Sequence, residues 1–383
     1  LKCNIIYKGE VRRISAKVKI ISIILLVVSI IAMITTYIVN DNIREFIDTK
    51  VLKKEISDDS VKNIYTNSSI IQTMALGKNI VTLSSGELKV YDFEGNNKNT
   101  IKMKIGNPIY DIEDRYMGIA DKNVTKIYLI DDDKLAWEKT LDVTVEKIKV
   151  NKNGYMVVVT KDSVYKSVVS VYSNKGELLF KSYVSNGYVI DTEISPDNNY
   201  LVIGEVDYSK TFTESTVKVI DVKKAIKAEE GSLINTFVKD KLLVNLKIKE
   251  NLSIIGQYSD SVVNIGYNKN ENKEIYKLSN VYMADIENTR YSFVIKKEEQ
   301  EDIIKLKNTY VCIIFNESGN EVAKYNIGDT TPKNVIAKLD SIAINLGTEL
   351  VVINQNGWIK KKYNSTKEIS RYDISRIYNN SLV

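Results

Sequence analysis

One short pattern returns along most of the chain: an apolar, strand-like run that ends in a polar residue and a bend. Residues 89–96 read KVYDFEGN, and related stretches begin at 128 (YLIDDDK), 170 (SVYSNKGE), 218 (KVIDVKK), 264 (NIGYNKNE), 312 (CIIFNESGNE) and 350 (LVVINQNG). The polar residues that end these runs are Asp92, Asp131, Ser173, Asp221, Asn268, Asn316 and Asn354. They are separated by 38 to 48 residues, and a period of roughly 40 to 50 residues is typical of β-propeller blades, which carry four strands each.

Each repeat holds enough alternating segments for four strands. In the third repeat, residues 143–150 alternate and are followed by strand-like runs over 154–163, 167–176 and 177–185, with Gly, Asn or Asp at the bends. In the fourth repeat, Pro196, Asp197 and Asn198 predict a turn between two apolar runs. The sequence therefore predicts an all-β fold, a β-propeller with seven blades.

The ends of the repeat leave eight blades open as an alternative. Residues 369–383 (ISRYDISRIYNNSLV) read as the first strand and a half of another unit. They either complete a blade begun near residues 61–75, as in propellers that close with strands from both termini, or start an eighth blade. Residues 222–234 interrupt the strand pattern and predict a short helical insertion.

A transmembrane helix is predicted before the propeller. The stretch from Ile20 to Val39, with Leu25 and Leu26 near its start, is free of charged residues over its whole length. A helix of about 20 residues rises about 30 Å, which matches the hydrocarbon core of a bilayer. Neither a small-residue cleavage site nor a lipidation cysteine follows, so we expect a retained single span rather than a cleaved signal peptide.

The flanking charges predict the orientation of this span. The basic residues that precede it closely are Arg12, Arg13, Lys17 and Lys19, whereas Asp41 and Glu45 follow it. The positive-inside rule then places the N-terminus in the cytoplasm. The expected organisation is a basic cytoplasmic tail over 1–19, a membrane helix over 20–39, a juxtamembrane helix or linker over 40–60 and an extracellular propeller over 61–383. The protein is thus expected in the cell membrane.

The charge balance argues against a nucleic-acid partner. The chain carries a formal net charge of +5, but residues 1–39 hold six basic residues and one acidic residue, which leaves 48 of each kind over residues 40–383. A nucleic-acid-binding domain normally carries a basic excess of its own. We therefore expect no nucleic-acid partner.

The residues needed for most catalytic sites are missing. The chain contains no histidine and two cysteines, Cys3 and Cys312, which the predicted membrane separates. Histidine-based triads, the commonest zinc ligand and a structural disulfide are therefore excluded. Phosphate-binding Gly-rich loops are absent as well. Carboxylate clusters such as Asp131–Asp133 read as a solvated turn, so no catalytic residue, cofactor or metal is predicted and the chain is not expected to be an enzyme.

Two segments carry a family resemblance. YLIDDDKLAWEKTL (128–141) and SVYSNKGELLFKSYV (170–184) resemble units of WD40-like and quinoprotein-like (PQQ-like) propellers, with Trp137 and Phe180 at the start of the outermost strand. The order of basic tail, span, short helix and propeller resembles uncharacterised membrane-anchored propeller proteins of low-GC Gram-positive bacteria. Trp-Asp dipeptides are absent, in contrast to true WD40 repeats.

These patterns predict a membrane-tethered, extracytoplasmic propeller that acts as a non-catalytic binding or scaffolding module for protein or glycan partners at the cell envelope. Loops and the channel mouth of a propeller offer a rigid binding surface. Two alternatives remain: an envelope sensor that relays a signal through its single span, and a hydrolase that uses carboxylates alone.

Overall fold

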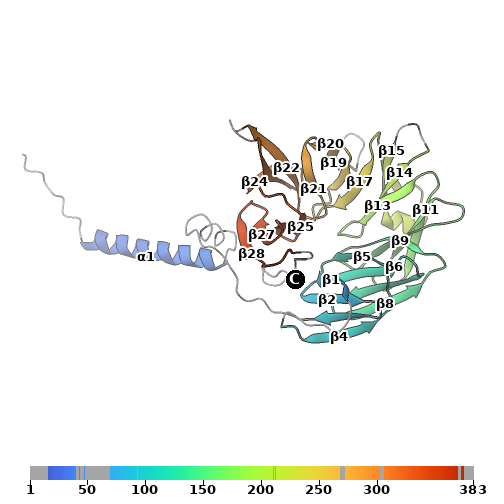
Figure 1. Cartoon of the computed structure of the whole chain (residues 1–383), viewed down its shortest axis with the longest axis horizontal. Helices are drawn as coiled ribbons and strands as arrows, with labels where there is room; N and C mark the ends of the chain where they lie inside the picture. The colour runs from blue at the N-terminus through green and yellow to red at the C-terminus, as the bar shows by residue number, and fades with distance from the viewer. Residues whose placement is uncertain are drawn as a thin grey trace, which may run out of the picture. The chain divides into compact units, whose positions relative to one another are not determined.

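The computed structural model describes residues 16–39, 43, 47, 70–92, 94–209, 211, 213–267, 272–301, 306–369 and 372–374. The chain divides into two compact units, Leu1–Glu55 and Ile56–Val383. In the second unit, the described residues form seven four-stranded antiparallel sheets, and every sheet uses four consecutive strands. The predicted seven-bladed β-propeller is therefore confirmed (Figure 1).

The strands are short and follow the repeat closely. Blade 1 contains β1 (Ile70–Leu76), β2 (Asn79–Ser84), β3 (Glu87–Tyr91) and β4 (Asn97–Lys102); blade 2 contains β5 (Pro108–Glu113), β6 (Tyr116–Asp121), β7 (Lys126–Asp131) and β8 (Lys134–Thr140); blade 3 contains β9 (Val145–Val150), β10 (Met156–Thr160), β11 (Ser167–Tyr172) and β12 (Leu178–Val184). Blade 4 contains β13 (Tyr188–Ile194), β14 (Tyr200–Asp207), β15 (Glu214–Asp221) and β16 (Leu233–Lys239); blade 5 contains β17 (Leu243–Ile248), β18 (Ile254–Tyr258), β19 (Ser261–Ile265) and β20 (Lys273–Lys277). Blade 6 contains β21 (Val281–Asp285), β22 (Tyr291–Glu301), β23 (Leu306–Asn316) and β24 (Glu321–Gly328); blade 7 contains β25 (Asn334–Lys338), β26 (Ser341–Asn345), β27 (Glu349–Asn354) and β28 (Ile359–Asn364).

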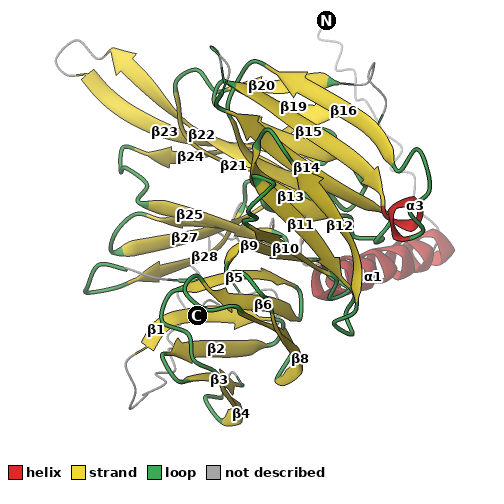
Figure 2. Ribbon diagram, turned by 90° about the vertical axis from the view of Figure 1, so that its right-hand side faces the viewer, coloured by secondary structure: helices red, strands yellow, loops and turns green. Residues whose placement is uncertain are grey.

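The first strand of each blade lies nearest the centre of the ring and the fourth lies at the rim (Figure 1). Hydrophobic clusters fill the space between successive sheets, as in the cluster of Met74, Leu83, Met117 and Ile119 between blades 1 and 2. One sheet cannot bury both of its apolar faces alone, so each blade depends on its neighbours. In Figure 2 the hairpin of β22 and β23 extends beyond the neighbouring strands.

The repeated polar residue marks the turn from the third strand to the fourth. Asp92, Ser173, Asn316 and Asn354 each accept a hydrogen bond from the backbone N–H four residues later. The glycine three residues after them takes a positive φ, 81° at Gly176 and 73° at Gly357. A short acceptor side chain followed by Gly is what this turn requires, which explains why the pattern returns.

The other repeat positions differ locally. Asp131 ends β7 at a tight turn in which Asp132 has a positive φ. Asp221 ends β15 and caps α3 (Val222–Ile226) by accepting a hydrogen bond from the Lys224 N–H. The helical insertion predicted over 222–234 is thus confirmed at its start but is shorter, because β16 begins at Leu233. Asn268 lies outside the described residues.

One alternative from the sequence was that residues 369–383 complete a blade begun near residues 61–75. The structure differs from it. All four strands of blade 1 come from residues 70–102, so within the described residues the C-terminal stretch contributes no strand to that sheet. Ile374 instead packs on Ala343, Leu350 and Val352 of blade 7.

The N-terminal unit contains α1 (Ala16–Val39). The side chains of Thr35 and Thr36 donate hydrogen bonds to the helix's own carbonyl groups at Ile31 (2.8 Å) and Ala32 (2.7 Å). Across the described part of the chain, no helix has the combined length and apolar character needed to cross a membrane. Apart from Ile43 and Ile47, the juxtamembrane segment predicted over 40–60 lies outside the described residues, and so do the topology residues Arg12 and Arg13.

Candidate functional site

Charged side chains on the first strands of the blades, or directly after them, gather around the centre of the ring. Blades 2, 4 and 6 contribute the acidic pairs Asp111 and Glu113, Asp191 and Glu193, and Asp285 and Glu287. Blades 3, 5 and 7 contribute the basic residues Lys147 and Lys149, Lys247 and Lys249, and Lys338. Apart from Glu146 of β9, which is exposed and pairs with Lys161, the sign of the charge alternates from blade 2 to blade 7, while β1 carries no charged residue. We call these eleven residues the channel ring.

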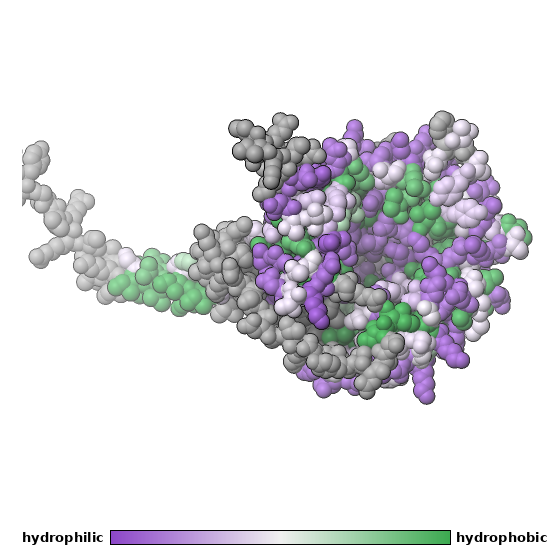
Figure 3. All heavy atoms as spheres, viewed as in Figure 1, coloured by the Kyte–Doolittle hydropathy of each residue, from purple (hydrophilic) through white to green (hydrophobic). Residues whose placement is uncertain are grey.

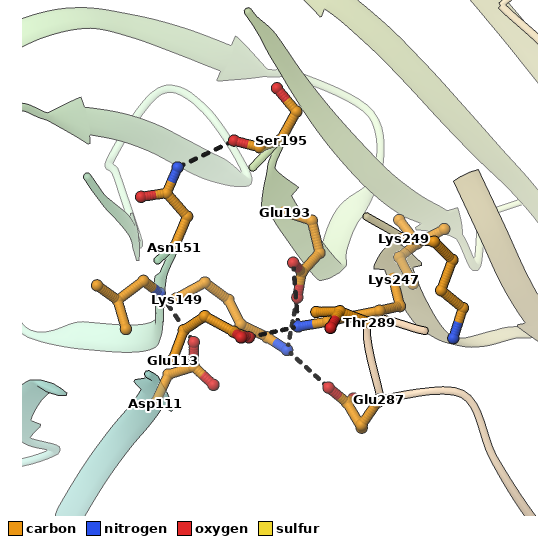
Figure 4. Close-up of polar contacts among 12 residues, drawn as sticks. Asp111, Glu113, Lys149, Asn151, Glu193, Ser195, Lys247, Lys249, Glu287 and Thr289 are labelled. Atoms are coloured by element: carbon orange, nitrogen blue, oxygen red, sulfur yellow. Dashed lines mark hydrogen bonds and ion pairs between the residues drawn. The ribbon is translucent and has the colours of Figure 1, made fainter. Parts of the chain in front are cut away.

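Two lysines hold the centre of the channel ring together (Figure 4). Lys149 Nζ lies 3.1 Å from Glu193 Oε1 and 3.6 Å from Glu287 Oε2, although these carboxylates belong to different blades. Lys247 Nζ lies 3.3 Å from Glu113 Oε2 and 3.5 Å from Glu193 Oε2. Each lysine thus bridges two carboxylates across the channel.

Neighbouring blades are also joined by hydrogen bonds of the acidic residues to backbone. Asp111 Oδ2 accepts a hydrogen bond from the Val150 N–H of blade 3 (2.8 Å), and Asp191 Oδ2 accepts one from the Leu246 N–H of blade 5 (2.9 Å). Lys249 is fully buried and donates hydrogen bonds to the carbonyl oxygens of Ile286, Asn288 and Tyr291. The acids and bases therefore fix the spacing between blades.

Burial and ion pairing shift the pKa values of this ring in opposite directions. Burial raises the pKa of Glu193 to about 7, although Lys247 and Lys149 oppose the shift. Burial also opposes ionisation of Glu287, but Lys149 and Lys247 outweigh it and lower its pKa to about 2. Burial lowers the pKa of Lys249 to about 7, and the nearby Lys247 adds to this shift.

A cavity of about 460 Å³ opens beside the ring at the channel mouth. Its polar lining includes Glu113, Lys247, Asp285, Glu287 and Arg290, and its apolar and aromatic lining includes Met74, Tyr110, Val335, Tyr372 and Ile374. Figure 3 shows a recess near the centre of the ring with hydrophilic residues gathered around it. Its volume is in the range of small-ligand and side-chain pockets.

One of the acidic residues of the cavity has no ion-pair partner among the described residues. Asp285 Oδ1 accepts a hydrogen bond from the Glu287 N–H at 2.6 Å. Burial raises the pKa of Asp285 to about 6, and repulsion from Glu287 adds to the shift. The described residues contain no group of three or more acidic or sulfur ligands placed to hold a metal ion.

Apart from Asn268, which lies outside the described residues, the repeat residues singled out from the sequence lie away from this site, at turns after the third strands of the blades. Sequence analysis did not identify the channel ring, although a signal was present. The tripeptides Asp-Ile-Glu (111–113), Asp-Thr-Glu (191–193) and Asp-Ile-Glu (285–287) alternate along the chain with Lys-Ile-Lys at 147–149 and 247–249. Each triplet lies on or beside the first strand of its blade, which becomes visible only when the blades are assigned.

Sequence comparison assigns the chain to a family. A model described as "Family of unknown function (DUF5711)" matches residues 51–382, which includes the whole described propeller. The chain belongs to DUF5711. A search of curated proteins finds no significant match.

This chain is similar in structure to solved proteins of low sequence identity. This DUF5711 member is similar to apo AztD from Citrobacter koseri, with 8% identity and a TM-score of 0.49 over 82% of this chain and 91% of that chain. It is also similar to the Pan2 WD40 domain of Neurospora crassa, with 13% identity and a TM-score of 0.41 over 59% of this chain and 71% of that chain. Kuenenia stuttgartiensis hydrazine synthase matches with 10% identity and a TM-score of 0.41 over 86% of this chain and 99% of that chain.

Proposed function

We propose that this chain is a membrane-tethered, extracytoplasmic propeller that acts as a non-catalytic binding or scaffolding module for protein or glycan partners at the cell envelope. The observation that carries the proposal is the cavity at the channel mouth. It is lined by both aromatic and charged side chains and is built on the first strands of several blades.

The composition of the cavity suits a polar partner with apolar parts. Tyr110 and Tyr372 provide rings and hydroxyl groups, which contact both sugars and peptide side chains well. Asp285 and Glu287 add carboxylates. Because the ion pairs of the channel ring hold its walls, binding should require little rearrangement.

Site-specific photo-crosslinking in cells tests the binding proposal. Lys152 lines the cavity and is exposed, and Lys175 is another exposed lysine, in the turn between β11 and β12 of the same blade. A crosslinker at Lys152 should give discrete adducts, and one at Lys175 should not. Adducts at both positions, or at neither, would argue against a cavity that binds envelope partners.

The proposed tether rests on the uncharged stretch from Ile20 to Val39 and on the basic residues before it. Thiol labelling of intact cells tests the predicted topology. Cys312 is fully buried and should not react, whereas Val164 is 80% exposed. Cys3→Ser removes the other thiol besides Cys312. In this background Val164→Cys should react with a membrane-impermeant maleimide in intact cells, whereas labelling only after lysis would place the propeller in the cytoplasm.

One observation favours the carboxylate-only hydrolase as a second candidate. Asp285 and Glu287 line the same cavity, and their pKa values are shifted apart, to about 6 and about 2. Such a pair can divide the roles of acid and base in glycoside hydrolysis. Under this alternative, Asp285→Asn would abolish a wall-glycan hydrolysis that the wild type performs, whereas a binding module would show no turnover in either form.

A further inference from the structure

The segment Tyr372–Ile374 repeats a tripeptide found on the first strand of blade 2. Residues 110–112 and residues 372–374 both read Tyr-Asp-Ile. The first copy lies within β5, between blade 1 and blade 3. The second copy follows blade 7 and lies between blade 7 and blade 1, where the ring closes.

Both copies contact the sheet before them through the tyrosine hydroxyl and the isoleucine, although the partners of the two hydroxyl groups differ. The hydroxyl group of Tyr110 accepts a hydrogen bond from the Gln72 side chain of blade 1, at 3.0 Å. The hydroxyl group of Tyr372 donates one to the Ala343 carbonyl of blade 7, at 3.2 Å. Ile112 packs against the hydrophobic cluster of blade 1, and Ile374 packs against that of blade 7.

The two copies also make the same contact with the sheet after them. Asp111 Oδ2 accepts a hydrogen bond from the first strand of blade 3, and Asp373 Oδ2 accepts one from the Ala75 N–H on the first strand of blade 1, at 2.9 Å. Asp373 further pairs with Lys338 of blade 7, with 2.8 Å between Nζ and Oδ1. In the same way, Lys147 of blade 3 pairs with Asp191 of blade 4.

The alternating charges of the channel ring explain why such a segment is needed. The alternation runs from the acidic blade 2 to the basic blade 7 and ends at blade 1, whose first strand is uncharged. Seven first strands would place Lys338 of blade 7 directly beside the uncharged β1. Asp373 supplies an acidic member between them, so that Lys338 gains a partner on its open side.

We propose that the junction between blade 7 and blade 1 is an eighth first-strand site, a peptide-binding site that the chain fills with its own Tyr372–Ile374. The ligand class is an extended peptide that presents an aromatic residue, an aspartate and an aliphatic residue in sequence. The aspartate joins Lys338 to the Ala75 N–H, and the aliphatic side chain covers blade 7. The segment also lines the cavity of the proposed function. The inference does not depend on that function, because its tests measure how the ring closes and not whether an envelope partner binds.

Hydrogen exchange on the full chain tests the role of Asp373, with Asp111 as a matched control. Asp373→Ala should accelerate exchange of the Ala75 amide at least about tenfold, because its acceptor is lost, and should leave the Val150 amide unchanged. Asp111→Ala should do the reverse. Equal acceleration at both amides in either variant, or no change at Ala75 in Asp373→Ala, would overturn the proposal. Lys338→Met, which keeps the aspartate, serves as a second variant and should give a smaller effect in the same direction as Asp373→Ala.

Peptide binding tests whether the junction is a site that accepts a ligand. The probe is a labelled peptide with the sequence of residues 368–376, EISRYDISR. The tethered segment competes at a high effective concentration in the wild type, so the peptide should bind the full-length Asp373→Ala variant about tenfold or more tightly than the wild type. A peptide with Asn in place of the aspartate should lose this gain. Equal affinity of the peptide for the wild type and the Asp373→Ala variant, or binding to neither, would overturn the proposal that the junction is a peptide-binding site.

Discussion

Leu246 and Lys247 are neighbours on β17, and their side chains enter two different environments. Leu246 is fully buried in the apolar cluster between blades 4 and 5. Lys247 is nearly as buried, yet it faces the channel and lies beside Glu113 and Glu193. At the apolar interface, every methylene that is removed from water stabilises the fold. In the channel, the removal of each charge from water costs free energy, which an oppositely charged partner must offset. The two environments should therefore respond differently to mutation, pH and salt.

The largest loss is expected when one partner of the channel ring is removed. Lys247→Met leaves Glu113 and Glu193 without their shared lysine, which should lower the free energy of unfolding by about 3–5 kcal/mol at pH 8. The loss should shrink at pH 5, because Glu193 then takes up a proton and no longer needs a counter-charge. Chemical denaturation at the two pH values measures this. A loss that is the same at both would contradict the ion-pair account.

Next in size is the change at the adjacent apolar position. Leu246→Ala leaves a cavity between two sheets and should lower the free energy of unfolding by about 3–4 kcal/mol. Because no titratable group is involved, denaturation at pH 5 and pH 8 should give the same loss. A clear pH dependence would mean that the apolar interface and the channel are not separate.

The pH profile of the unfolding free energy should reveal Glu193 itself. Its pKa is about 7 in the folded protein, above the ordinary value, so the folded state binds more protons than the unfolded state between about pH 4.5 and pH 7. Stability from this group is therefore present at low pH and is lost as pH rises through 7. The difference in unfolding free energy between wild type and Glu193→Gln should fall by about 3 kcal/mol over this range and then stay constant. Leu246→Ala provides the control, because its profile should run parallel to that of the wild type.

The smallest effects are expected at the rim turns, which belong to neither environment. At Gly231 the φ is +71° and an added Cβ would meet nothing within 4 Å, so Gly231→Ala should cost only the left-handed backbone strain of about 1 kcal/mol. At Gly357 the φ is +73° and the Cβ would lie 2.9 Å from the Lys324 carbonyl oxygen. Gly357→Ala should therefore lower the melting temperature more than Gly231→Ala does. Equal losses of stability in the two variants would show that backbone strain alone, and not the contact with the Lys324 carbonyl, sets the effect of alanine at these turns.

Sequence reasoning predicted the local features of the fold well. The turn that begins at Asn354 needs a short acceptor side chain and a glycine three residues later, and both are local requirements that the residues satisfy on their own. The four strands of blade 3 were predicted for the same reason, since alternation and bends lie within a few residues of one another. The helical insertion was predicted too long: α3 ends at Ile226, Ala228 takes a positive φ that a helix does not allow, and Leu233 already pairs with Ile220 of β15.

The channel ring was not predicted from the sequence, because its members are distant in the chain. Asp111, Lys149 and Glu193 are about 40 residues apart from one to the next, and nothing local distinguishes them from exposed charges on a strand face. Their inward orientation depends on which strand of each blade is the first, and on how the blades follow each other around the ring.

By itself, the sequence determined the repeat, the strand-turn chemistry and therefore the β-propeller, because these depend on interactions between residues close together in the chain. Only the tertiary structure decided that the acids and bases meet in one channel, that a cavity opens beside them, and that Asp373 lies between the last blade and the first. Those contacts join residues up to 298 positions apart, and their partners are chosen when the ring closes.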